Sequence, residues 1–221
     1  MTKIISHEHP EYCRRRGGTS ERGRWNGAFY YSHEIVRNII PNVETDRNWI
    51  TINVPFYGYD HSVVFIHNNK TPETYDWLRR YKDLVLVCGI PETCEKVSGI
   101  GRAVYLPLSI DVQDVKRHSG KKTRERAFVG RSVKRQGIYF PPGTDAIENM
   151  PRDRMLDEIA RYKEVYAVGR CALEAKALGC KILPYDPRFP DPSRWKVVDN
   201  LKAAEMLQKI LDEIDGKDTE K

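Results

Sequence analysis

The sequence lacks the features that mark several large classes of protein. No apolar run approaches the roughly 18 residues of a membrane span, and residues 1–8 have no signal-peptide core. The five cysteines are scattered without a Cys-x-x-Cys pair, which favours reduced thiols over a disulfide framework. There is also no Walker loop, no Gly-x-Ser-x-Gly and no zinc-ligand spacing. We therefore expect a cytoplasmic protein with no membrane span.

Basic residues exceed acidic ones, 37 against 31, for a formal charge of +6. Much of the excess lies in residues 14–24 and 116–135. One interpretation is a solvated basic face that aids solubility. The other is a pair of loops that meet a polyanion or a diphosphate. Net charge does not separate a small phosphorylated ligand from nucleic acid.

Short apolar runs typical of strands alternate with segments of helical periodicity, which predicts βαβ units. The expected fold class is α/β, with two Rossmann-like halves, mostly parallel sheets and a trimmed second half. The polar stretch 111–126 is the expected linker. We expect domains over 1–115 and 116–215, followed by a disordered tail over 216–221. The strands expected in the second half cover residues 127–129, 137–140, 165–168 and 181–185.

The segment from Val165 to Tyr185 reads as a strand, a tight glycine turn, a short helix and a second strand. Gly169 would let the backbone approach a ligand, and the amides of the next three residues would point out of the helix N-terminus. Such a helix end suits a phosphate. Glu174 lies about one turn further along, where its carboxylate could accept two vicinal sugar hydroxyls. The alternative is an ordinary βαβ element with a surface glutamate. The residues expected to supply amides are Arg170, Cys171 and Ala172.

The run Gly169-Arg-Cys-Ala-Leu-Glu174-Ala-Lys-Ala-Leu-Gly179 resembles the "lEAmA-x-G" signature of retaining GT-B glycosyltransferases of the glycogen-synthase-like group. The resemblance implies that Glu174 binds the ribose of a nucleotide sugar. It also implies that Gly169 and the small residues after it give amides to the diphosphate.

A second segment, about forty residues earlier, resembles the "fvGR…KG" segment of the same family. It runs from Phe128 to Gly137. Here the resemblance implies that Gly130, Arg131 and Lys134 contact the donor diphosphate. A guanidinium fork and a lysine point charge suit two phosphates. A strand end followed by a basic loop is the alternative.

Two weaker matches lie in the first half. Arg16-Gly17-Gly18 with Glu21-Arg22 resembles the family's "GG-x-e-r" loop near donor or acceptor, although mobile loops also carry such glycines. His67 falls where the family often places a histidine in the interdomain cleft, which makes it the candidate catalytic residue. A structural histidine at a strand end is the alternative.

The chain departs from the family in having Tyr166 where the first acid of the E-x7-E pair would stand. The resemblance nevertheless implies a retaining glycosyltransferase that moves a sugar from a nucleotide-diphosphate donor to an unknown acceptor, which could be a nucleic-acid base. The alternative is a non-catalytic GT-B-like module that binds nucleotide or DNA. No obligatory cofactor or metal is expected, because basic side chains and helix amides would stabilise the leaving diphosphate. His7-Glu8-His9 could be a metal site but has no evident third ligand.

Overall fold

The computed structural model describes most of the chain, in these ranges: 2–6, 27–51, 58–66, 72–130, 137–148, 150–185 and 191–216. The described residues divide into two compact units. The first unit contains residues 2–6, the described residues between 28 and 108, and residues 200–216. The second contains Gly27 and the described residues between 109 and 199. None of the described helices combines the length and apolarity needed to cross a bilayer.

The first unit is built on a sheet of five parallel strands that follow one another in chain order. Strands β3 and β4 form its centre, and their residues are at most 4 % exposed. Their apolar runs, Val-Val-Phe-Ile and Leu-Val-Leu-Val, are typical of parallel strands that are buried on both faces. The five strands are β1 (Ile4–Ile5), β2 (Asn48–Ile50), β3 (Ser62–Ile66), β4 (Leu84–Cys88) and β5 (Arg102–Tyr105).

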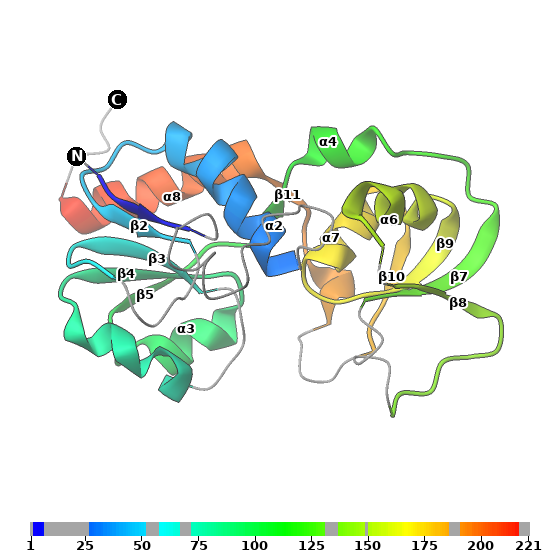
Figure 1. The fold of residues 1–221 in the computed structure, drawn as a ribbon, viewed down its shortest axis with the longest axis horizontal. Helices are drawn as coiled ribbons and strands as arrows, with labels where there is room; N and C mark the ends of the chain where they lie inside the picture. Colours follow the sequence, from blue (N-terminus) through cyan, green and yellow to red (C-terminus); the bar gives the residue numbers. More distant parts are fainter. Residues whose placement is uncertain are drawn as a thin grey trace. The chain divides into compact units, whose positions relative to one another are not determined.

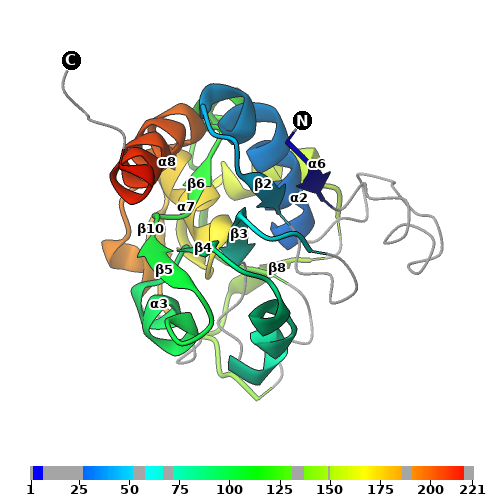
Figure 2. The same ribbon diagram turned by 90° about the vertical axis from the view of Figure 1, so that its left-hand side faces the viewer.

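Helices lie on both sides of this sheet. Figures 1 and 2 show α2 and α8 on one side and α3 on the other. Helix α2 continues through a π-helical turn into a 3-10 turn that contains Pro41, where the missing amide ends the regular pattern. The helices are α2 (Gly27–Glu34), η2 (Ile35–Ile39), η3 (Ile40–Asn42), η4 (Pro72–Arg80), α3 (Pro91–Val97) and α8 (Asn200–Asp215).

Helix α8 belongs with the first unit, whereas the sequence suggested that residues 200–215 belong to the second half. Polar contacts attach α8 to the rest of the first unit at three points along its length. At its start the Asn200 amide donates to Glu34 over 3.0 Å, and in its middle the Gln208 amide donates to the Glu44 carbonyl over 3.1 Å. At its end Asp215 accepts from Arg47. Between these contacts the helix buries a stripe of small and apolar side chains: Ala203, Ala204, Leu207 and Leu211.

The second unit contains a sheet of four parallel strands in the order β10-β9-β7-β8. Helices α6 and α7 lie side by side over one face of it (Figure 1). A short parallel pair, β6 with β11, joins the segment that enters this unit to the one that leaves it. The elements are β6 (Ser109–Ile110), α4 (Val112–Lys116), β7 (Arg124–Val129), β8 (Thr144–Ile147), α6 (Arg152–Ile159), β9 (Tyr162–Tyr166), α7 (Arg170–Ala177), β10 (Lys181–Leu183), η5 (Pro192–Arg194) and β11 (Val198–Asp199).

The α/β class with parallel sheets is confirmed, and two local expectations are wrong. Residues 111–126 are not a linker, because they contain α4 and the start of β7. The Asp111 side chain caps α4 by accepting from the Asp114 amide over 2.8 Å. In β7 the charged Arg126 is accommodated because it pairs with Glu164 on the neighbouring strand. The strand expected at 137–140 is absent from the described residues there, and β8 forms at Thr144–Ile147 instead.

Candidate functional site

The two sheets differ in the order of their strands, and the difference locates a candidate site. In the second sheet the chain passes from β7 to β8 on one side, and then to β9 and β10 on the other. In open α/β sheets, ligands bind beyond the carboxyl ends of the strands where the order reverses in this way. The reversal lies between β7 and β9, where Phe128 and Tyr166 are paired in register. Gly130 follows the first strand and Gly169 follows the second.

Gly169 forms the turn into α7 as the sequence predicted. Its φ of 59° and ψ of −139° belong to a region that L side chains rarely adopt. A Cβ added there would meet no atom within 4 Å, so the backbone conformation and not crowding requires glycine. Helix α7 then presents its positive dipole end at the carboxyl edge of the sheet. The amide of Ala172 is already used, since it donates to the Gly169 carbonyl over 3.1 Å.

Gly130 is constrained by packing against aromatic rings. A Cβ added there would lie 2.9 Å from the ring of Phe128. Phe128 in turn contacts Phe140 and Tyr185, with ring centroids 5.2 Å apart in both pairs. Phe140 also packs edge-on against Tyr166, at 5.0 Å. The carboxyl edge of the second sheet therefore combines a glycine turn, a helix N-terminus and a group of aromatic side chains.

Glu174 is buried, in contrast to the expected ligand of a ribose. Its side chain is 2 % exposed. One carboxylate oxygen, Oε1, accepts from Nε of Arg170 at 2.9 Å and from Nε of Arg152 at 3.0 Å. The two arginine side chains are each 8 % exposed. The carboxylate is thus turned into the unit and engaged by two guanidiniums.

Arg152 and Asp114, which no sequence motif singled out, complete this network. Arg152 is the first residue of α6 and also donates from Nη1 to Asp114 of α4, over 2.7 Å. Burial alone would raise the pKa of Asp114, but its hydrogen bond to Arg152 and the charge of that arginine lower it overall. The sequence gives little sign of this role: Arg152 opposes the helix dipole, but Asp153 in the same turn already supplies a nearby acid.

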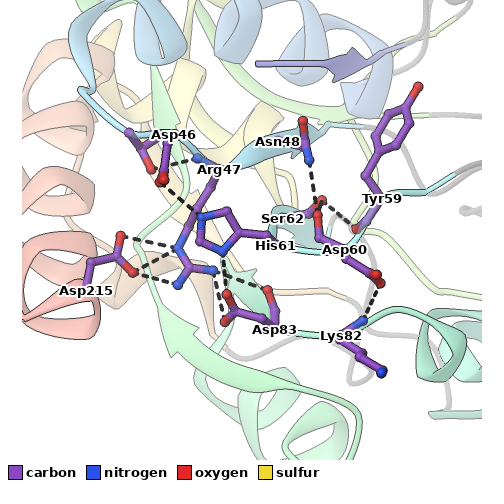
Figure 3. Close-up of polar contacts among 11 residues, drawn as sticks. Asp46, Arg47, Asn48, Tyr59, Asp60, His61, Ser62, Lys82, Asp83 and Asp215 are labelled. Atoms are coloured by element: carbon purple, nitrogen blue, oxygen red, sulfur yellow. Dashed lines mark hydrogen bonds and ion pairs between the residues drawn. The ribbon is translucent and has the colours of Figure 1, made fainter. Parts of the chain in front are cut away.

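A second polar cluster lies in the first unit, at the amino ends of β2, β3 and β4 (Figure 3). His61 lies between two aspartates: its Nδ1 contacts Asp83, and its Nε2 lies 3.0 Å from Asp46. Arg47, whose side chain is 4 % exposed, pairs with Asp83 at 3.2 Å and with Asp215 of α8 at 2.6 Å.

The His61 cluster has two unusual features: positive backbone φ angles and shifted side-chain pKa values. His61 and Asp83 both have positive φ, 51° and 50°. The hydrogen bonds to Asp83 and then to Asp46 raise the pKa of His61, and the bond from His61 lowers the pKa of Asp83. This end of the sheet is opposite to the carboxyl edge where ligands of parallel sheets bind. We therefore assign the cluster to stability.

Six of the residues that the sequence analysis proposed for the site lie outside the described residues, as do His7 and His9. Within the described ranges, no group of three His, Cys, Asp or Glu side chains is arranged to hold a metal ion. No family model matches this chain, and neither does any curated protein. The six residues are Arg16, Gly17, Gly18, His67, Arg131 and Lys134.

Proposed function

We propose that this chain is a glycosyltransferase that binds the diphosphate of a nucleotide sugar at the carboxyl edge of its second sheet. One observation carries the proposal. The two segments that resemble the GT-B donor site, about forty residues apart in the sequence, form the neighbouring strands β7 and β9 at the reversal of strand order. Gly130 and Gly169 therefore follow adjacent strand ends, where α/β sheets bind nucleotides.

In the proposed reaction, the protein stabilises the negative charge that develops on the departing diphosphate. The N-terminus of α7 contributes its dipole, and Arg170 at its first position contributes a cation that Glu174 partly neutralises. Arg131 and Lys134 are the further cations that we expect at the phosphates. Because these groups supply the electrostatic stabilisation, the mechanism requires no metal ion.

A binding measurement tests the first half of the proposal. Thermal unfolding would be followed with UDP-, GDP- and ADP-sugars, with the free sugars as controls. A ligand present at 100 times its Kd stabilises the folded chain by about 2.7 kcal/mol, which gives a readily measured rise in Tm. We expect such a rise with at least one nucleotide and none with free sugars. No rise with any nucleotide would contradict the proposal.

A non-catalytic nucleotide-binding module is the second candidate, and two observations favour it. Tyr166 ends β9 where the family's first acid would stand, and Glu174 is enclosed by Arg152 and Arg170. Release of nucleotide from the stabilising sugar donor distinguishes the two candidates. Slow hydrolysis of the donor that is lost in Gly169→Val indicates a transferase. Binding with no release, with or without simple sugars as acceptors, indicates the module.

A further inference from the structure

We propose that Glu174 is a positioning residue, which orients Arg152 and Arg170, and that it is not a ligand of the ribose. The inference rests on the proposed function, because it assigns a role within the same diphosphate site. It replaces the role that the sequence resemblance implied for this glutamate. Arg152, which no sequence motif identified, becomes part of the site.

The geometry of the carboxylate carries the inference. Both guanidiniums donate through Nε to the same oxygen, Oε1 of Glu174, at 2.9 and 3.0 Å. The three side chains are at most 8 % exposed. A ribose ligand must offer its carboxylate to two hydroxyls at the surface of the site. A carboxylate that is 2 % exposed and accepts from two arginines is instead placed to fix those arginines.

The charges around the carboxylate point the same way. Arg152 begins α6 and Arg170 begins α7, so each cation stands at the positive end of a helix dipole. Two such cations repel one another and the helix ends unless an anion lies between them. Glu174 is that anion, and Asp114 holds the other side of Arg152 at 2.7 Å. The carboxylate therefore keeps two cations at the edge where we propose that the diphosphate binds.

Titration calorimetry with the full chain tests this assignment, with inorganic pyrophosphate and with UDP, GDP and ADP as separate probes. The test variant is Glu174→Asp, which keeps the charge but shortens the side chain so that one oxygen no longer reaches both Nε atoms. We expect pyrophosphate and the nucleoside diphosphate to lose affinity by the same factor, about tenfold. The ratio of their affinities stays that of the wild type. Measurements are made well below the Tm of each variant.

Glu164→Asp is the matched control. Glu164 lies in the same unit and also accepts from two cations, Arg126 at 2.7 Å and Lys181 at 2.8 Å, but it belongs to strand β9. We expect this control to leave both affinities unchanged. If Glu174→Asp does not fold, Arg152→Lys serves instead, because it keeps the charge but loses the Nε donor, and the same parallel loss is expected.

Three results would overturn the inference. A loss confined to the nucleoside diphosphates, with pyrophosphate binding unchanged, would make Glu174 a ribose ligand. Unchanged affinity for both probes in a folded variant would make the network merely structural. If the wild-type chain binds neither probe, the proposed function and this inference both fail. This result is distinguishable from the other two, because in those the wild type still binds.

Discussion

Two networks of paired charges, one around His61 in the first unit and one around Glu174 in the second, differ in how far their members are exposed to water. Around His61, the aspartate partners Asp46 and Asp83 are 83 % and 54 % exposed. Around Glu174, both arginines and the glutamate are at most 8 % exposed. Charges in water interact weakly and are screened, whereas breaking a buried pair strands a charge in a medium that solvates it poorly. His61 and its two aspartates should therefore adjust stability slightly, Arg47, which is itself buried, should matter more, and the Glu174 network should be the most costly to disturb.

The networks also differ in what they hold together. Arg47 links the amino end of the first sheet to the last residue of α8, Asp215. Arg152 and Arg170 link three helices of the second unit, α4, α6 and α7, through Asp114 and Glu174. Only the second network lies beside the reversal of strand order. Its helices α6 and α7 begin where we propose that a ligand binds, so the buried ion pairs can serve binding as well as stability.

The largest effect is expected from Glu174→Ala. The change leaves two buried guanidiniums without their shared anion, which should lower the free energy of unfolding by about 3–5 kcal/mol. Urea denaturation followed by circular dichroism measures it. Glu164→Ala, at a side chain that is 23 % exposed, should cost under about 1 kcal/mol. Equal losses in the two variants would show that burial does not set the difference between these ion pairs.

A smaller effect is expected from Arg47→Ala in the exposed network. The arginine itself is buried. Without it, Asp83 is half exposed and regains water, whereas Asp215 of α8 is 15 % exposed and loses its counter-charge, so the expected loss is about 2 kcal/mol. The same urea experiment measures it. Arg79→Ala is the control. Arg79 and its partner Asp76 are both about half exposed, and its hydrogen bond to the Gly99 carbonyl is also exposed, so the change should cost under about 1 kcal/mol. A loss at Arg47 as small as that at Arg79 would contradict the role given to the contact with α8.

The smallest effect is a pH dependence that comes from His61. Because the folded protein raises the pKa of His61, the histidine's contribution is complete below its unfolded pKa of about 6.5 and is lost as pH rises through the folded value. The pKa of Asp83 is lowered, so its contribution is present above the unfolded carboxyl pKa and is lost as pH falls through the folded value. The contact is therefore strongest in mildly acidic solution.

Unfolding free energies at pH 5.5 and 8.5 test this dependence. We expect His61→Gln to reduce the difference between the two pH values by less than about 1 kcal/mol, because His61 is 39 % exposed. If the variant keeps the full wild-type difference in unfolding free energy between the two pH values, the pH dependence comes from other groups.

The central strands of the first sheet were predictable because their continuous apolar sequences require burial on both faces. The runs of β3 and β4 are apolar on both faces, which only a covered parallel sheet tolerates. The partner of α8 was not predictable in this way. Periodicity at Ala204, Leu207 and Leu211 reveals a buried stripe but does not say which sheet covers it. Strand β8 was missed because it is only four residues long, two of them polar, and only Ile147 is buried.

At the candidate site, local geometry was predictable and burial was not. Gly169 was identified as the turn before a helix because strand, glycine and helix follow directly in the sequence. The environment of Glu174 depends on Arg152, which is 22 residues away and reaches it through packing of α6 against α7. No short motif contains such a pair.

The side-by-side pairing of β6 with β11 has a consequence for synthesis. These strands mark where the chain enters and leaves the second unit, so that unit is an insertion with adjacent ends, placed ahead of α8. A ribosome makes β1 to β5 first, yet their covering helix emerges only after the whole insertion has been translated. The unit that begins first is therefore completed last. More than ninety further residues must be translated before α8 can cover one apolar face of its sheet.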